Sequence, residues 1–203
     1  MGDQIYGYGD WYLTAINIAF FGLFLLFIPF RKKVQRLPSS VYLAFVVALY
    51  AEMYGFPLTI YILTWFFGYQ NLLTHLSGHI LAPIIGEDIF FTYIHPLSNF
   101  IILAGALLIV YGWVVIHNAK KELVTSGVYS FVRHPQYLGF LLTTIGMLVQ
   151  WATIPTLVMW PVLAILYYRL AKREEREMQE KFGEQYLNYK KKVPMFFPHP
   201  RIK

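Results

Sequence analysis

Long apolar stretches separated by short polar connections dominate the pattern of this chain. Residues 11–30 form a run of twenty positions without a charge, which at about 1.5 Å of helix rise per residue crosses roughly 30 Å of hydrocarbon. Residues 41–67 and 96–117 form two further runs. The runs 135–150 and 155–170 are joined by only four residues, which predicts an antiparallel helical hairpin. The pattern predicts an all-α polytopic membrane protein with about five transmembrane helices.

Composition and charge support this interpretation and add an orientation. Hydrophobic residues make up 57% of the chain and charged residues 14%, whereas a soluble domain carries about a quarter charged. The 17 Lys and Arg fall within 31–36, within 120–133, and from 169 onward. The other connections have none, which is the positive-inside pattern. We therefore expect the N-terminus outside and the C-terminus in the cytoplasm, and we read the net charge of +6 as a topology signal, with no nucleic-acid partner.

We expect one membrane domain over residues 1–203. Its N-terminal part, 1–117, should hold three spans with an external segment at 68–95, which lacks basic residues. Residues 118–203 should hold a polar loop, the hairpin and a polar C-terminal helix that follows it. The chain has no cysteine, which excludes disulfides, thiolate metal sites and cysteine nucleophiles.

Two polar features of the N-terminal part leave alternatives open. Glu52 interrupts an apolar run and should face the bundle interior, either as a substrate contact or proton relay or as a buried polar clamp where Pro57 kinks the helix near Met53. His75 and His79 are four residues apart, a spacing that can share a metal, although interfacial polar residues are the commoner explanation.

The polar stretch 123–137, with the sequence LVTSGVYSFVRHPQY, is the first candidate for chemistry. Pro135 disfavours helix at the preceding residue and suits the first turn of a helix, so His134 should cap a membrane helix. The free N–H groups of that first turn favour a carboxylate or phosphate, and Arg133 and Tyr137 lie beside them. The alternative is that Arg133 is a membrane-flanking charge and His134 a plain cap.

From residue 171 the chain is polar and favours helix. Met178, Phe182 and Tyr186 follow one another at intervals of four and predict an apolar stripe on that helix. Gly183 should end or bend it. Glu174 and Glu175 lie where the last span leaves the membrane, in a run that is also typical of solvated salt bridges.

Taken together, LVTSGVYSFVRHPQYLG, a short apolar hairpin, and EE followed by FGEQYLNYKKKVP resemble the isoprenylcysteine carboxyl methyltransferase family of integral membrane methyltransferases, to which phospholipid methyltransferases are more distantly related. The resemblance covers roughly residues 121–194. It implies S-adenosylmethionine as methyl donor, bound in a cytoplasm-facing pocket that the loop, the hairpin and the C-terminal helix build.

The family resemblance also implies roles for single residues. Arg169, just before the EE pair, is the candidate for the acceptor side, although its spacing to FG differs by one residue from the family pattern. Glu175 could accept a proton from an amine acceptor. The implied cofactor-binding residues are Leu123, Val124, Tyr129, His134, Pro135, Tyr137 and Glu174, and the resemblance implies no metal.

The resemblance implies methyl transfer to a lipophilic acceptor, prenylated or lipid-like, that stays in the membrane lipid while it reacts at the cytoplasmic face. A phospholipid or a small lipophilic amine is the alternative acceptor. A sterol-type reductase that uses NADPH is a further alternative, but its signature places a glutamate after the glycine, where this chain has Phe140 after Gly139. A non-catalytic membrane scaffold is disfavoured by the concentration of polar residues in one loop.

Overall fold

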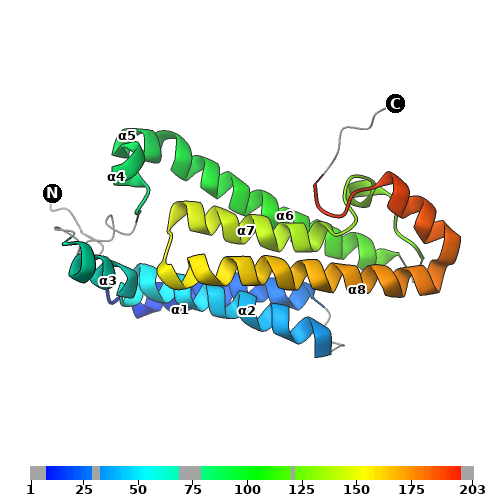
Figure 1. The fold of residues 1–203 in the computed structure, drawn as a ribbon, viewed down its shortest axis with the longest axis horizontal. Coiled ribbons are helices and arrows are strands. Elements are labelled where there is room, and N and C mark those ends of the chain that lie inside the picture. Colours follow the sequence, from blue (N-terminus) through cyan, green and yellow to red (C-terminus); the bar gives the residue numbers. More distant parts are fainter. Residues whose placement is uncertain (1–7, 29–32, 69–78, 120–121, 198–203) are drawn as a thin grey trace.

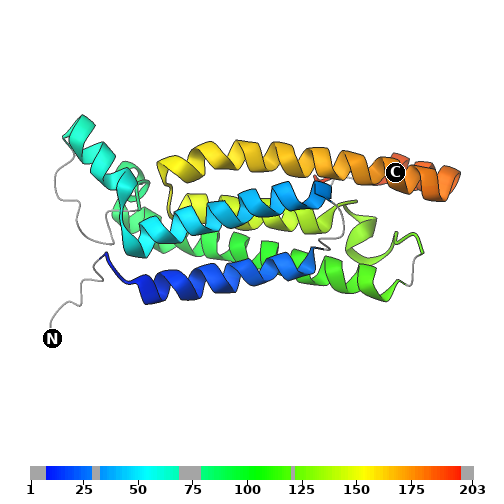
Figure 2. The same cartoon turned by 90° about the horizontal axis from the view of Figure 1, so that it is seen from below.

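The computed structural model describes residues 8–28, 33–68, 79–119 and 122–197, and all regular structure in these ranges is helical. The α-helices are α1 (Trp11–Leu23), α2 (Lys33–Tyr50), α3 (Leu58–Phe67), α4 (Ala82–Ile85), α5 (Glu87–Ile89), α6 (His95–Asn118), α7 (Pro135–Gln150) and α8 (Ile154–Lys192). Four short turns of 3-10 or π type add to these, at Phe24–Phe27, Ala51–Gly55, Phe90–Ile94 and Gly127–Ser130. Figures 1 and 2 show α1, α2, α6, α7 and α8 side by side along the long axis.

Among the described residues, three helices are long and apolar enough to cross a membrane, within Gln35–Gly55, Glu87–Asn118 and Ile154–Lys192. Two shorter apolar helices cover Trp11–Phe27 and Leu58–Phe67. Large apolar side chains cover the outside of the bundle. On α6, a stripe of side chains that are 52–67% exposed consists of Leu97, Phe100, Leu103 and Leu107. An apolar surface of this kind is expected where helices face lipid instead of water. The chain is therefore an all-α membrane protein.

Several helix boundaries differ from those that the sequence predicted. The third predicted span begins earlier than residue 96, because α5 continues through the π-helical turn Phe90–Ile94 into α6. Pro96 has no N–H to donate, and the wider turn just before it accommodates that loss. The hairpin is confirmed, but α8 continues past residue 171 without a break as far as Gly183, into the polar C-terminal segment that was expected to be a separate helix.

The predicted bends are confirmed. The apolar run 41–67 is divided by the turn Ala51–Gly55 and by Pro57, after which α3 begins. Gly183 has φ +52° inside α8, a backbone conformation that side chains with a Cβ rarely adopt, and the helix changes direction there. The turn beyond Gly183 brings the end of α8 back towards the rest of the bundle (Figure 1).

Glu52 lies at the bend that divides the apolar run 41–67. It is 6% exposed, and its Oε2 accepts the backbone N–H of Thr59 at 2.8 Å. That N–H is one of the donors that a helix start leaves unpaired, so the carboxylate joins α2 to α3. The contact supports the polar clamp over the substrate contact. His79 is also buried, with Nδ1 2.8 Å from the carbonyl oxygen of Gln150, whereas His75 lies outside the described residues.

Aromatic side chains from α2, α7 and α8 form the centre of the core. Tyr42 meets Phe140 edge to face with ring centroids 4.8 Å apart, and Phe140 stacks on Tyr167 at 5.5 Å. All three are fully buried. Such pairs contribute about 0.5–1.5 kcal/mol each beyond the area they bury. This cluster fixes α7 between α2 and α8.

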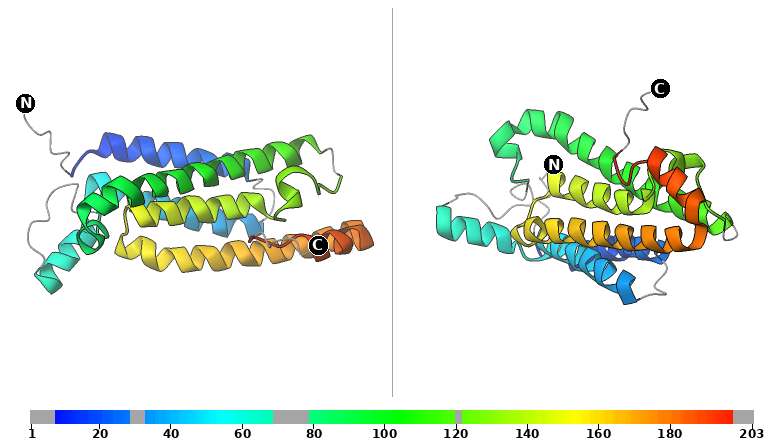
Figure 3. Two further views of the ribbon diagram at one scale, coloured as in Figure 1. Left: turned by 90° about the horizontal axis from the view of Figure 1, so that it is seen from above. Right: turned by 45° about the vertical axis from the view of Figure 1, so that its right-hand side comes forward.

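Helices α6 and α7 pack closely against each other, and Figure 3 shows them side by side. A Cβ built at Gly139 would lie 2.6 Å from the carbonyl oxygen of Gly105, and one at Gly105 would lie 2.6 Å from the carbonyl oxygen of Gly139. The two backbones are therefore in direct contact, as small residues allow in membrane bundles. This contact fixes the start of α7, which carries the candidate site.

The polar ends of the bundle helices gather at one end. Leu37 and Pro38, next to Arg36 on α2, line the same groove as Arg169 of α8, and Arg133 of the loop bonds to Glu175 of α8. Described members of all three basic segments of the sequence thus lie at the same end, as a shared side of a membrane requires.

Candidate functional site

The site is built on the loop that joins α6 to α7. Tyr129 of this loop is 5% exposed, and its hydroxyl donates to the carbonyl oxygen of Gly112 on α6 at 3.2 Å. Its own carbonyl oxygen accepts the hydroxyl of Tyr189 at 2.6 Å, from the end of α8. Tyr129 therefore holds the loop between α6 and the returning end of α8.

The loop ends at His134, which takes the N-cap position of α7, as predicted from Pro135. Its ring stacks on that of Tyr137, with centroids 5.7 Å apart and planes 9° from parallel. The Nε2 atom of His134 is buried and lies 3.6 Å from Oε1 of Glu175, so the ring faces that carboxylate. The first-turn N–H groups of α7 lie beside His134 and favour an anion.

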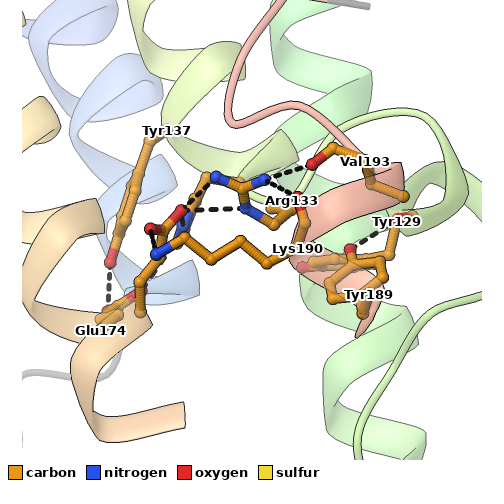
Figure 4. Close-up of polar contacts among 9 residues, drawn as sticks. Tyr129, Arg133, Tyr137, Glu174, Tyr189, Lys190 and Val193 are labelled. Atoms are coloured by element: carbon orange, nitrogen blue, oxygen red, sulfur yellow. Dashed lines mark hydrogen bonds and ion pairs between the residues drawn. The ribbon is translucent and has the colours of Figure 1, made fainter. Parts of the chain in front are cut away.

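Glu174 reaches this helix start from α8. The hydroxyl of Tyr137 donates to its Oε1 at 2.5 Å (Figure 4). Nδ1 of His134 lies 3.7 Å from its Oε2. Burial raises the pKa of the Glu174 carboxyl above its usual value, although the hydrogen bond from Tyr137 opposes the shift. Glu174 is thus a positioned carboxyl that faces the loop and the start of α7.

Glu175, the next residue, has a different environment. It is 1% exposed. Its Oε1 accepts hydrogen bonds from Nε of Arg133 at 2.9 Å and from Nη2 at 2.6 Å. Nζ of Lys190 lies 2.9 Å from its Oε2. Burial alone would raise the pKa of this carboxyl, but His134, Lys190 and Arg133 lower it to about 2. Adjacent carboxyls with pKa values shifted in opposite directions are typical of functional sites.

Arg133 ties the C-terminal segment to the loop. Its Nη1 donates to the carbonyl oxygens of Lys190, at 3.1 Å, and of Val193, as Figure 4 shows. The backbone N–H groups of Arg133 and His134 donate to the carbonyl oxygens of Pro194 and Met195, at 2.9 and 3.2 Å. The side chain of Arg133 and the backbone of Arg133 and His134 therefore hold the chain beyond Gly183 against the loop by hydrogen bonds.

A pocket of about 270 Å³ lies between these elements. Its lining comes from the end of α6, the loop, the start of α7 and the polar part of α8. The lining residues are Ile116, Ala119, Glu122, Leu123, Val124, Tyr129, Arg133, His134, Gln136, Tyr137, Glu174, Met178, Lys181, Phe182, Tyr186 and Tyr189. One wall is apolar and aromatic, and the helix start with Glu174 supplies the polar wall.

Most of the predicted site residues meet in this pocket. Six of the seven predicted cofactor-binding residues line it, and they are Leu123, Val124, Tyr129, His134, Tyr137 and Glu174. Pro135 is buried at the helix start and does not line the pocket. The predicted stripe of Met178, Phe182 and Tyr186 forms part of the apolar wall.

The two residues predicted for the acceptor side lie elsewhere. Glu175 is held in the cluster with Arg133 and Lys190, and Arg169 lines a second groove on α8. Neither lines the pocket. The contact between Lys190 and Glu175 could not be predicted from the sequence, since it depends on the bend at Gly183. Within the described residues, no group of three or more His, Cys, Asp or Glu side chains could hold a metal ion.

Part of this chain is similar in sequence to known proteins. The family model of phospholipid methyltransferases matches residues 98–185. The chain is 39% identical over 88 residues to a protein-S-isoprenylcysteine O-methyltransferase of Xenopus laevis, which covers 41% of this chain and 31% of that protein. It is 39% identical over 77 residues to a methanethiol S-methyltransferase of Pseudomonas deceptionensis, covering 36% of this chain and 27% of the relative.

A third relative is the cobalt-zinc-cadmium resistance protein CzcN of Cupriavidus metallidurans, at 30% identity over 113 residues, 53% of this chain and 52% of that protein. The chain spans 31% of the length of the isoprenylcysteine methyltransferase it matches. The matched segment holds the α6–α7 loop, α7 and Glu174. Through this segment the chain is similar to the phospholipid methyltransferases and to isoprenylcysteine methyltransferases.

Proposed function

We propose that this protein transfers a methyl group from S-adenosylmethionine to a lipophilic acceptor at the cytoplasmic face of a membrane. The observation that carries the proposal is the pocket in which the start of α7, Glu174 and the aromatic wall of α8 converge. The comparisons support it, because the phospholipid methyltransferase model matches residues 98–185, which hold the α6–α7 loop and Glu174, and two of the relatives named above are methyltransferases by name.

The residues of the pocket suit this donor. S-adenosylmethionine combines an aromatic base with a zwitterionic, positively charged end. The wall of Met178, Phe182 and Tyr186 offers apolar and aromatic surface for the base. The first-turn N–H groups of α7 suit a carboxylate, and His134 caps that helix start. The carboxylate of Glu174 complements ribose hydroxyls or an ammonium group.

When bound, the donor supplies an activated methyl group, which passes from the sulfonium sulfur to an acceptor oxygen, nitrogen or sulfur and leaves a neutral thioether. The protein then contributes position and exclusion of water more than strong acid or base catalysis. Tyr137 holds the carboxyl of Glu174 by a hydrogen bond of 2.5 Å. Arg133 and Glu175 hold the C-terminal segment, so that Tyr186 and Tyr189 close one side of the pocket.

The acceptor and the full set of spans belong to the proposal too. We infer five spans, formed by α1, α2, α6, α7 and the part of α8 up to residue 170, with the N-terminus outside and the pocket in the cytoplasm. The basic residues at the pocket end of the bundle support this orientation.

A prenylated or lipid-like carboxylate is the preferred acceptor class, and a phospholipid or small amine is the alternative. Only acceptors that partition into lipid should be methylated.

The test is equilibrium binding of S-adenosylmethionine and of NADPH to the detergent-purified protein. We expect binding of the first and none of the second. His134→Ala and Glu174→Ala should each weaken binding of S-adenosylmethionine by roughly tenfold or more, because each removes a charged or polar partner of the ligand. Glu180→Ala, on the exposed surface of α8, is the matched control and should leave the affinity unchanged.

Unchanged affinity in both His134→Ala and Glu174→Ala would refute the assignment of the pocket. NADPH binding would move the protein to the reductase class.

For the acceptor side, Arg169→Ala should spare binding of S-adenosylmethionine and reduce methyl transfer, whereas loss of binding would assign Arg169 to the binding site of the donor. Glu175→Gln tests whether Glu175 accepts a proton from an amine acceptor. A changed pH profile of transfer would assign it that role, and an unchanged profile would exclude it.

A further inference from the structure

A second concave surface lies on the side of α8 that faces α2. It has a volume of about 580 Å³ and is lined by Leu37, Pro38, Leu166, Tyr168, Arg169, Leu170, Lys172, Arg173 and Arg176. We call it the basic groove. It shares no lining residue with the pocket described above. Its four basic residues are spaced at i, i+3, i+4 and i+7 along α8, which places them on one face of the helix.

The positive charge of the basic groove is barely compensated. Its lining, drawn entirely from described residues, contains no acidic side chain. Glu177 lies beside it, with Oε1 3.8 Å from Nε of Arg173, but both side chains are substantially exposed and such pairs contribute little. Glu174 and Glu175 bond to Tyr137 and Arg133 on the other side of α8. The groove therefore presents a local excess of positive charge.

The same face of α8 changes character along its length. Towards the N-terminus it carries Val158, Val162 and Ile165, which are 67%, 47% and 53% exposed. These positions continue the spacing of the basic residues backwards in steps of three or four. An exposed apolar stripe thus leads directly into the basic groove, where Leu166 and Leu170 supply apolar lining. The surface matches a molecule with an anionic head and a long apolar tail.

We propose that the basic groove binds an anionic phospholipid of the surrounding membrane. Its phosphate lies against the guanidinium groups of Arg173 and Arg176, and its acyl chains lie along the stripe of Val158, Val162 and Ile165. Arginine suits phosphate because its planar fork donates two parallel hydrogen bonds. Basic pockets between helices at the cytoplasmic membrane surface bind such head groups. The lipid bridges α2 and α8 and stabilises their junction.

The experiment compares lipids that differ only in head group. The detergent-purified protein is titrated with phosphatidylglycerol or with phosphatidylcholine of the same acyl chains, and binding is measured by native mass spectrometry and by thermal unfolding. We expect preferential binding of phosphatidylglycerol and a higher unfolding temperature with it. Arg173→Gln/Arg176→Gln should weaken that binding by roughly tenfold or more, since each base near a membrane surface contributes about fivefold.

The matched control is Lys191→Gln/Lys192→Gln, which removes the same charge from exposed positions of α8 outside the groove. It should retain the preference for phosphatidylglycerol. Arg169 stays unaltered in both variants, so the result is independent of its predicted role at the acceptor. Three outcomes would overturn the proposal: equal binding of the two lipids, equal losses in the two variants, or competition by inorganic phosphate as effective as by the lipid.

Discussion

Glu175→Gln is expected to lower the free energy of unfolding by about 3–5 kcal/mol, the usual cost of removing one partner from a buried ion pair. The substitution leaves the guanidinium of Arg133 buried, at 9% exposure, without its carboxylate. It also removes the partner of Lys190, whose Nζ lies 2.9 Å from Oε2. Because Arg133 fastens residues 190–193 to the loop, the same change should loosen the side of the pocket that the end of α8 forms.

Thermal and denaturant unfolding in detergent measure this effect. Glu177→Gln is the matched control, because Glu177 forms an ion pair on the same helix with Arg173 that is largely exposed. Pairs of that kind contribute about 0–1 kcal/mol, so the control should unfold close to the unaltered protein. Equal stability of the two variants would show that the cluster around Glu175 does not hold the C-terminal segment.

The effect of Glu175 should depend on pH in a direction set by its charge. Its pKa is lowered in the folded protein from the usual 4.5 to about 2, so folding favours the ionised carboxylate. This contribution to stability is fully present above about pH 4.5 and is lost as pH falls towards 2. The difference in stability between the unaltered protein and Glu175→Gln should therefore be constant from pH 7 to 5 and shrink below that range.

The local part of the site could be predicted from sequence because its rules are local. Pro135 restricts the residue before it and suits a helix start, so His134 was placed at the cap and Tyr137 one turn later, as the structure shows. The stripe of Met178 and Phe182 follows from helical periodicity. These rules need only neighbouring residues.

The long-range part could not be predicted in the same way. Arg133 was read as either a ligand or a membrane-flanking charge, and neither reading included its bonds to Glu175 and the backbone of Val193. Those contacts arise because α8 bends at Gly183, and the angle of a bend is not encoded in spacing. The position of Arg169 on the far side of α8 follows from how the helix is rotated against α2, which packing decides.

The positions of the helices could be predicted from the sequence, but some of their ends could not. The apolar runs located the helices, since burial and lipid contact both select apolar residues. The extension of α6 back to Glu87 lies outside the predicted run 96–117, whose first residue is Pro96. A proline disrupts a helix only if the lost hydrogen bond cannot be accommodated, and the π-helical turn Phe90–Ile94 accommodates it here.

Gly139→Ala is expected to destabilise the protein by about 1–3 kcal/mol, although alanine is the better helix former. The new methyl group would lie 2.6 Å from the carbonyl oxygen of Gly105 and 2.8 Å from Cγ1 of Ile109. A backbone oxygen cannot rotate away, so α6 and α7 must separate. Gly22→Ala is the opposite control, because its methyl group would meet only Cδ1 of Leu43 at an ordinary 3.7 Å, and it should be neutral or stabilising by about 0.5–1 kcal/mol.

The same substitution links packing to the site. Gly139 lies one turn beyond the start of α7. The loop before α7 is held to α6 by the hydrogen bond from Tyr129 to Gly112. Separating α6 from α7 therefore moves the start of α7 relative to the loop. Binding of S-adenosylmethionine should therefore weaken in Gly139→Ala and remain unchanged in Gly22→Ala when both are measured below their unfolding temperatures. A destabilised Gly139→Ala that binds with full affinity would show that the site does not depend on the glycine contact, because the loop and α8 alone would then hold His134 and Glu174 in place.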